Sequence, residues 1–261
     1  MKRTAAVNKE KHEFSLFVES LSSLIQNIKP RQAFIISDEK LLHRMMTVLR
    51  LRVDDSCILF DRTVHVVCTV VAFIGKKQIH MIMKSQQLTV ALSPSITFLL
   101  PLLKRDDYEG ALYSLAELGV SAIQPVITKK THTSWSDRDA DRAERILIAA
   151  AEQSKNYAIP MLKTPISLDK AVQVVDKGAT KVFFDPLGET FFSVMRMLHD
   201  NQPKHIILLI GPEGDLSSEE KKMVKEKGFI FCALTPTIVR AVQAAALGAG
   251  LVRSLFISPS F

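Results

Sequence analysis

The sequence predicts a two-part α/β protein, in which a small β-barrel precedes a larger, mainly parallel sheet with helices on both faces. Two features of the chain lead to this prediction. Residues 56–83 are rich in β-branched side chains and are interrupted by turn signals, which is typical of short antiparallel strands. Residues 84–94 are polar and end in Ser93-Pro94, and beyond them apolar runs alternate with helical stretches. We place the domain boundary in this polar segment.

The first part contains one amphipathic helix among its strands. Asp38 offers a helix cap, and the apolar residues from Leu41 to Leu49 recur at helical spacing. The expected strands are 33–36, 56–60, 64–74 and 78–83. The expected division is an N-terminal lead-in over residues 1–30, of which 1–13 are mobile, a barrel over 31–90 and an α/β domain over 91–261.

The second part alternates strands with helices, which predicts a parallel sheet covered on both faces. The expected strands are 96–100, 122–127, 181–184, 205–210 and 229–234. The expected helices are 106–118, 138–155, 167–177, 189–199, 217–227 and 239–255.

Composition restricts the class of protein. A net charge of +7 and a pI near 9.3 favour a polyanionic partner, although a basic surface also serves solubility alone. The three cysteines, Cys57, Cys68 and Cys232, lie in apolar runs without metal-ligand spacing, so we expect core residues, no metal and no disulfide. No signal-peptide region and no apolar run of roughly 20 residues is present, and we expect a cytoplasmic protein that does not enter a membrane.

The segment with the strongest functional signal is His205–Leu216, HIILLIGPEGDL. An apolar strand leads into Gly211-Pro212-Glu213-Gly214, and Ser217 with Glu220 forms a capping box that begins a helix. Such a loop lies where open α/β sheets bind ligands, and its glycines permit close backbone approach. On spacing alone, an ordinary strand-to-helix turn explains the loop equally well.

Several other ligand-binding motifs are absent from the sequence. It has no GxGxxG after a strand, no GxxxxGK[ST] and no nucleophile elbow. These absences disfavour dinucleotide-binding folds, P-loop enzymes and serine hydrolases.

Taken in order, five segments resemble one family, the RsmE-type ribosomal RNA uridine-N3 methyltransferases. The resemblance covers roughly residues 33–256. The segments are Leu42-His43 with Val48–Leu51 and Phe60-Asp61, YSLAELGVSAIQP (Tyr113–Pro125), IAAAEQSKNYAIP (Ile148–Pro160), the GPEG loop with Ser217 and Glu220, and LTPTIVRAVQA (Leu234–Ala244).

The resemblance implies a PUA-like N-terminal barrel and a C-terminal SPOUT domain with a trefoil knot. It also implies an S-adenosylmethionine-dependent homodimer that methylates N3 of a uridine in small-subunit (16S) ribosomal RNA. The residues expected to bind the cofactor are Gly211, Pro212, Glu213, Gly214, Leu234, Thr235, Ile238 and Val239. Those expected to bind RNA are Arg31, Arg44, Arg50, Arg52, Lys104 and Arg105, although a solvated helix face accounts for the cluster almost as well.

Two residues are the catalytic candidates. Arg240 can neutralise charge on the uracil oxygens as the N3 proton leaves, because a guanidinium stays protonated. Glu213 can orient Arg240 or accept a proton. The simpler alternatives are that Arg240 pairs with a phosphate or a carboxylate at a helix start and that Glu213 caps its own helix.

The chain also departs from the family pattern. The departures are Ser114, Asn156, Asp215, Thr235, Thr237 and the run Ala241-Val242-Gln243, which stands where the family has Thr-Glu-Thr. They leave two further hypotheses open, a non-catalytic RNA-binding relative and a small-molecule enzyme on an unrelated α/β fold.

Overall fold

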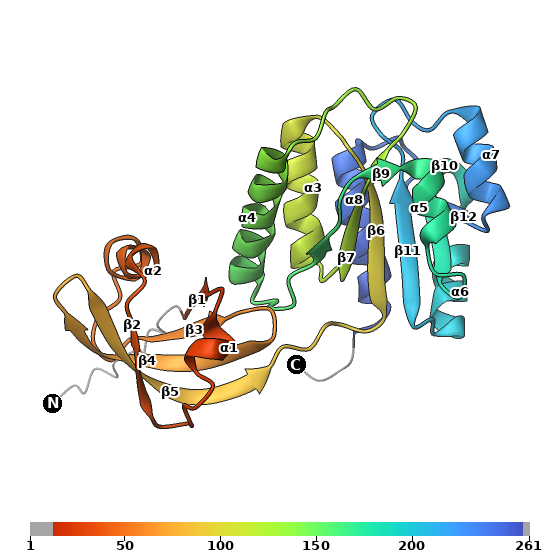
Figure 1. Ribbon diagram of the computed structural model, residues 1–261. Helices are drawn as coiled ribbons and strands as arrows, with labels where there is room; N and C mark the ends of the chain where they lie inside the picture. Colours follow the sequence, from red (N-terminus) through yellow and green to blue (C-terminus); the bar gives the residue numbers. More distant parts are fainter. Residues whose placement is uncertain (1–12, 258–261) are drawn as a thin grey trace, which may run out of the picture. The chain divides into compact units, whose positions relative to one another are not determined.

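The computed structural model describes residues 13–257. The chain forms two compact units that divide between Thr89 and Val90. Each unit has its own sheet and its own apolar core, and each is described by itself (Figure 1).

Unit 1 is built on a five-stranded sheet in the order β1-β3-β4-β5-β2. β1 pairs parallel with β3, and the other neighbours are antiparallel. The elements are β1 (Phe14–Phe17), α1 (Leu21–Leu24), β2 (Ala33–Ile36), α2 (Glu39–His43), a π-helical turn (Arg44–Val48), β3 (Ser56–Phe60), β4 (Val64–Ile74) and β5 (Gln78–Leu88).

The predicted helix of unit 1 is present, but only Glu39–His43 is α-helical. Asp38 caps α2 as expected, since its Oδ1 accepts a hydrogen bond from the Leu41 amide at 2.7 Å. After His43 the chain continues as the π-helical turn, in which the Leu49 amide donates to the carbonyl of Arg44. Apolar spacing alone does not distinguish the two kinds of helix.

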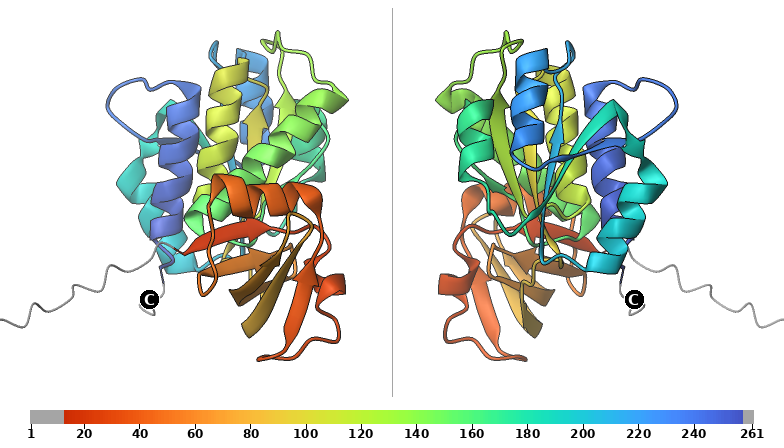
Figure 2. Two further views of the ribbon diagram at one scale, coloured as in Figure 1. Left: turned by 90° about the vertical axis from the view of Figure 1, so that its left-hand side faces the viewer. Right: turned by 90° about the vertical axis from the view of Figure 1, so that its right-hand side faces the viewer.

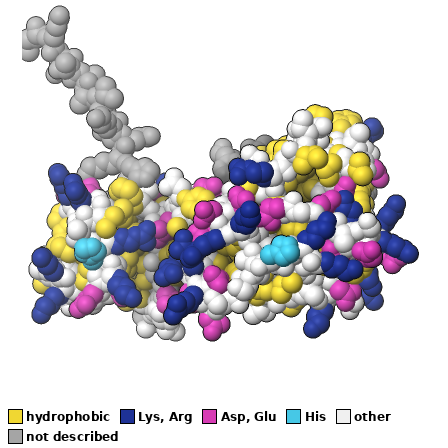
Figure 3. Space-filling model, turned by 90° about the horizontal axis from the view of Figure 1, so that it is seen from above, with side chains coloured by type: hydrophobic (Ala, Val, Ile, Leu, Met, Phe, Trp, Pro, Cys, Tyr) yellow, Lys and Arg dark blue, Asp and Glu magenta, His cyan; other side chains and the backbone are white. Residues whose placement is uncertain are grey.

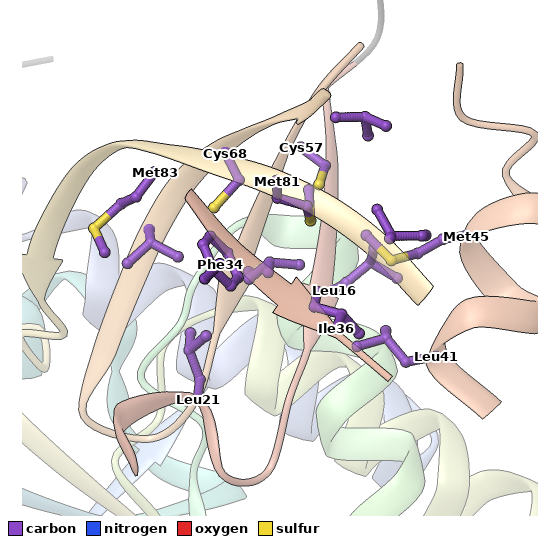
Figure 4. Packing of buried hydrophobic residues seen from close by; sticks show 14 of the residues in the cluster. Leu16, Leu21, Phe34, Ile36, Leu41, Met45, Cys57, Cys68, Met81 and Met83 are labelled. Atoms are coloured by element: carbon purple, nitrogen blue, oxygen red, sulfur yellow. The ribbon is translucent and has the colours of Figure 1, made fainter. Parts of the chain in front are cut away.

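The core of unit 1 lies between these strands and α2 (Figure 4). In β4 the alternate residues Val64, Val66, Cys68 and Val70 are buried, which matches the period of a strand with one covered face. Cys57 is also fully buried, and burial raises the pKa of its thiol to about 12. The expectation that the cysteines are core residues is confirmed, because Cys232 in unit 2 is fully buried as well.

The N-terminal segment differs from the predicted lead-in. β1 pairs in register with β3 from Phe14 to Phe17, and Leu16 and Leu21 are fully buried in the unit 1 core. A strand of four residues whose partner lies 43 positions later in the chain gives no local signal, so sequence periodicity did not reveal it. Residues 1–12 lie outside the described part of the chain.

Unit 2 has a sheet in the order β12-β10-β11-β6-β7-β8, with β9 also paired to β7. All of its described pairs are parallel. The elements are β6 (Ser95–Pro101), α3 (Arg105–Glu117), β7 (Ala122–Ile127), α4 (Asp137–Ser154), β8 (Met161–Leu162), β9 (Ile166–Ser167), α5 (Leu168–Val174), β10 (Thr180–Thr190), α6 (Phe191–Asn201), β11 (His205–Ile210), α7 (Ser218–Glu226), β12 (Ile230–Ala233) and α8 (Ala241–Ser254).

Helices cover both faces of this sheet (Figures 1 and 2). α3 packs against α4 and α8 on one face, and α5 packs against α7 on the other. β11 lies inside the sheet, and its residues Ile206–Ile210 are all buried, as expected for an apolar run in a parallel sheet. The predicted fold class is therefore confirmed.

The details of unit 2 correct three expectations. β10 continues to Thr190, beyond the predicted end at Phe184, because Glu189 and Thr190 pair with Cys232 and Ala233 after a register shift. Consequently α6 begins at Phe191. The two-residue strands β8 and β9 are too short for a sequence pattern to reveal.

Within residues 13–257, no helix is both long enough and apolar enough to cross a bilayer.

Candidate functional site

A cavity of about 530 Å³ lies at the carboxyl edge of the unit 2 sheet. This volume is typical of sites for small molecules and cofactors. Its walls come from three adjacent strands and the chain that follows them, with one residue from α3. They are Phe184–Pro186 from β10, Ile210–Asp215 after β11, Leu234, Thr235, Thr237–Ala241 and Ala244 after β12, and Asp107 from α3.

The GPEG loop connects β11 to α7 and forms one wall. Its helical end is closed by the predicted capping box, in which Ser217 Oγ accepts from the Glu220 amide and Glu220 Oε2 accepts from the Ser217 amide at 2.8 Å. Its first glycine leaves no room for a side chain, since a Cβ on Gly211 would lie 2.8 Å from Asp215 Oδ1. Gly211 lines the cavity, and a larger residue there would displace the Asp215 end of the same loop.

Two lysines hold the outer part of the same loop. Glu213 Oε1 accepts a hydrogen bond from the Lys104 amide at 2.9 Å, which ties the loop to the start of α3. Lys130 Nζ donates to the carbonyl of Gly214 at 2.6 Å. These contacts fix the loop relative to the strands β6 and β7.

A second wall of the cavity is formed by the segment 234–241. The turn at its start is closed by Thr235, whose Oγ1 donates to the carbonyl of Thr237 at 2.5 Å. Arg240 precedes α8, and its Nη1 lies 3.6 Å from Asp107 Oδ1. The Arg240 side chain is 69% exposed, so this ion pair leaves the guanidinium accessible to a ligand.

Comparison with known proteins identifies the unit that carries the cavity. A family model described as the RNA methyltransferase domain matches residues 91–253. The chain belongs to this RNA methyltransferase family. The match includes every residue that lines the cavity.

Curated relatives of this RNA methyltransferase carry the name ribosomal RNA small subunit methyltransferase E. The chain is 28% identical to the one from Synechocystis sp. over 67% of its own length and 57% of the relative's. It is 24% identical to the one from Rickettsia conorii, over 82% of its own length and 86% of the relative's. The predicted resemblance to RsmE-type enzymes is confirmed.

Solved structures share the fold of both units. A ribosomal RNA small subunit methyltransferase E from Neisseria gonorrhoeae, bound to S-adenosyl methionine, superposes with a TM-score of 0.80 at 22% identity and covers 94% of this chain and 98% of that one. A Legionella pneumophila protein in complex with bound SAM gives a TM-score of 0.78 at 24% identity, with the same coverage.

All of the predicted cofactor residues of this methyltransferase line the cavity, together with both catalytic candidates. Their pairing differs from the prediction, however. Glu213 does not orient Arg240 in the structure, because its Oε1 binds the Lys104 amide while Arg240 pairs with Asp107. The sequence offered no signal for Asp107, which lies more than 130 positions before its partner.

The cavity also contains residues that sequence reasoning missed. Asp185 and Pro186 directly follow the predicted strand 181–184, and the rule that ligands bind at carboxyl ends of parallel strands would have found them. Asp185 is 2% exposed, and its Oδ2 lies 2.5 Å from Lys221 Nζ. The same Nζ lies 2.6 Å from Asp215 Oδ2.

The charge of Lys221 is stabilised by these two carboxylates. Partial burial alone lowers the pKa of the Lys221 ammonium, but its bonds to Asp185 and Asp215 outweigh that effect and raise the pKa overall. The ammonium therefore stays charged at neutral pH.

The predicted RNA-binding residues fall into two groups. Arg31, Arg44, Arg50 and Arg52 belong to unit 1, where all but the half-buried Arg44 are exposed. Lys104 and Arg105 belong to unit 2 and are also exposed. Figure 3 shows basic side chains interspersed with acidic ones on the face that it draws.

Arg105 is less available than the sequence suggested. Its Nε lies 3.1 Å from Glu109 Oε1, and Arg142 binds the same carboxylate. The hydrogen bond from Arg142 is the main cause that lowers the pKa of Glu109, with a smaller contribution from Arg105. Glu109 thus neutralises part of the charge that RNA would meet at this point.

Proposed function

We propose that this protein is an S-adenosylmethionine-dependent methyltransferase that acts on N3 of a uridine in small-subunit ribosomal RNA. The observation that carries the proposal is the cavity formed by the GPEG loop and the 234–241 segment, inside the domain that defines the family. The names of the curated relatives support the substrate class.

The cavity fits S-adenosylmethionine in size and chemistry. Phe184, Ile210, Leu234 and Val239 supply apolar surface for an adenine, and Gly211 supplies a place where a ligand can approach the backbone. We propose that the eight predicted cofactor residues hold the ligand. Bound there, S-adenosylmethionine would supply an electrophilic methyl group on its sulfonium sulfur.

The residues of the chain would position the uracil and stabilise its charge. As the N3 proton leaves, negative charge spreads to the uracil oxygens, and the accessible guanidinium of Arg240 can neutralise it. Asp107 restricts the orientations of that guanidinium. Glu213, held by the Lys104 amide, keeps the GPEG loop against α3 and remains a candidate proton acceptor.

The reacting edge of uridine is its Watson–Crick edge, so the base must be unpaired or flipped to enter the cavity. The surrounding RNA would then be bound through phosphates and shape. We propose that Arg31, Arg44, Arg50 and Arg52 of unit 1 and Lys104 and Arg105 of unit 2 supply those phosphate contacts.

We also propose a homodimer that works in the cytoplasm. Leu187, Phe192 and Ile238 are 91%, 74% and 86% exposed, and all three belong to segments at or beside the cavity walls. Large apolar side chains with such exposure are typical of surfaces that a partner covers. A second copy of the chain is the simplest partner, and ultracentrifugation at micromolar concentration tests it.

One observation favours a second candidate function, a non-catalytic RNA-binding relative. The run Ala241-Val242-Gln243 replaces the expected Thr-Glu-Thr, and Ala241 lines the cavity. Gln243 serves instead as a helix cap, since its Oε1 accepts from the Arg240 amide at 3.4 Å.

A methyl-transfer assay distinguishes the two candidate functions. The protein is incubated with S-adenosylmethionine labelled in its methyl group and with small-subunit ribosomal RNA or particles, and the RNA is digested to nucleosides. Labelled N3-methyluridine supports the enzyme. RNA binding without label in any nucleoside supports the non-catalytic relative.

A further inference from the structure

One lysine bridges two cavity walls without lining the cavity itself. Lys221 lies in the first turn of α7, and its Nζ contacts Asp185 Oδ2 at 2.5 Å and Asp215 Oδ2 at 2.6 Å. Asp185 belongs to the wall from β10, and Asp215 ends the GPEG loop. The ammonium therefore connects two segments that are separate in the chain and adjacent at the cavity.

Each aspartate accepts a backbone hydrogen bond on one oxygen and pairs with Lys221 through the other. Asp185 Oδ1 accepts from the Leu187 amide at 2.8 Å, and Asp215 Oδ1 accepts from the Leu216 amide at 2.7 Å. The oxygens that remain, both Oδ2 atoms, face Lys221. Rotation of either carboxylate would break its backbone hydrogen bond or lengthen its ion pair with Lys221, so the bridge restricts the positions of both segments.

Asp185 depends on the ion pair with Lys221 because its side chain is buried. The side chain of Asp185 is 1% exposed and that of Lys221 is 24% exposed. A buried carboxylate needs a compensating positive charge, and Lys221 supplies it for Asp185. At Asp215, which is 49% exposed, the ion pair is screened more strongly by water.

The bridge also supports the backbone conformation of Asp215. Asp215 has a φ of +60°, in the left-handed region that favours glycine. An aspartate adopts this conformation more readily when its side chain binds nearby groups. Here the Leu216 amide and Lys221 provide those groups.

We infer that Lys221 is a positioning residue, which holds the β10 wall and the GPEG loop at the separation that the bound cofactor requires. The identity of that cofactor rests on the proposed function. Lys221 is not itself a cavity-lining residue, so it acts through Asp185 and Asp215.

The test compares Lys221→Met with Lys222→Met. Lys222 is the next residue of the same helix and is exposed, so it matches the charge and the local sequence without the bridge. We expect Lys221→Met to weaken S-adenosylmethionine binding by about tenfold or more, because small displacements of a binding wall are costly. Lys222→Met stays within about twofold of the wild type. Lys221→Arg keeps most of the affinity, because it retains the charge.

Two further readouts separate positioning from general stability. In the ligand-free protein, the amides of Leu187 and Leu216 should exchange with deuterium faster in Lys221→Met, while amides of β6 and β11 are unchanged. In turnover assays the KM for the cofactor should rise more than kcat falls. A variant that was only less stable would show faster exchange throughout unit 2.

A double variant keeps the test valid if Lys221→Met does not fold. Asp185→Asn with Lys221→Met leaves no unpaired buried charge, and the asparagine oxygen can still accept from the Leu187 amide. We expect the same loss of affinity from this double variant. Wild-type affinity in it, or in a folded Lys221→Met, overturns the inference.

A failure of the proposed function would give a different result from a failure of the inference about Lys221. If the wild type itself bound no S-adenosylmethionine, the proposed function would fail. The exchange of Leu187 and Leu216 in the ligand-free variants would still decide whether Lys221 holds the two walls.

Discussion

Arg240 and Asp107 meet at the cavity, with 3.6 Å between Nη1 of the arginine and Oδ1 of the aspartate. The first residue precedes α8 and the second lies in the first turn of α3, two helices that pack against each other on one face of the sheet. The pair thus places a cationic group beside the GPEG loop through helix packing.

Replacing Arg240 by alanine should separate binding from transfer. We expect S-adenosylmethionine to bind with nearly unchanged affinity, because the predicted adenine pocket is apolar and backbone-lined. Methyl transfer should fall about 100- to 1000-fold, the usual cost of removing one group that stabilises developing charge. Calorimetry and a labelled-methyl assay on the same sample check both parts. Equal losses in affinity and turnover would assign Arg240 to cofactor binding instead.

Gly211→Val should abolish cofactor binding in a folded protein. A Cβ at this position would lie 2.8 Å from Asp215 Oδ1 and 3.3 Å from Asp215 Cα, so the loop must move out of its present path. Gly178→Val is the control, because its nearest neighbour would be a side-chain oxygen at 3.5 Å. Retained binding in Gly211→Val would show that the ligand does not approach this wall.

The two glycines of α8 should differ in their effect on stability. A Cβ on Gly248 would lie 2.3 Å from the ring of Phe184, a cavity residue, whereas one on Gly250 would meet only Leu118 methyl groups at 3.4 Å or more. We expect Gly248→Ala to lower the free energy of unfolding by about 1–3 kcal/mol through overpacking. Gly250→Ala should change it by less than about 1 kcal/mol, since alanine favours the helix. Urea denaturation of both variants measures the difference.

Asp61 should make the stability of unit 1 depend on pH. Burial raises the pKa of this carboxyl, but hydrogen bonds from the amides of Thr63, Val64 and Ser22 outweigh burial and lower the pKa overall. A lowered folded-state pKa means that the stabilisation is complete above about pH 4 and is lost as pH falls through the folded value. Asp61→Asn should lower the free energy of unfolding by about 2 kcal/mol at pH 7, because the side-chain NH2 of the asparagine would face the backbone N–H of Ser22.

The measurement is thermal unfolding of the wild type and of Asp61→Asn from pH 7 down to pH 2. The difference between their unfolding temperatures should shrink as pH falls. A difference that is constant over this range would mean that the Asp61 charge contributes nothing to stability.

Arg50→Ala with Arg52→Ala should weaken RNA binding and leave cofactor affinity nearly intact. If both arginines contact phosphates, affinity should fall about tenfold or more at moderate salt, and the dependence of log affinity on log salt should become shallower by about 2. Lys76→Ala with Lys77→Ala removes the same charge from the β4–β5 turn and is the control. Equal losses from both pairs would indicate a general effect of net charge, and a loss of cofactor affinity would indicate a structural role for this region.

The sequence predicted the elements whose signals are local. β11 is an apolar run, the start of α7 has a capping box, and β4 alternates between buried and partly buried residues from Val64 to Val70. Strand β1 was not predicted, because it is held in place by pairing with β3 and no local sequence pattern shows that pairing.

The same reason separates the predicted site residues from the missed ones. The GPEG loop and Arg240 belong to motifs that can be read in one stretch of chain. Asp107, Asp185 and Lys221 gain their roles from partners on other elements, which only the folded sheet brings within contact.

The most direct test of the central claim is calorimetric titration of S-adenosylmethionine into the wild-type protein at two temperatures, so that a zero enthalpy at one of them cannot hide binding. We predict saturable binding at one site per chain, with a Kd between about 1 µM and 1 mM. No heat at either temperature up to about 1 mM cofactor, from a protein shown to be folded, would contradict it and leave the non-catalytic RNA-binding relative in its place.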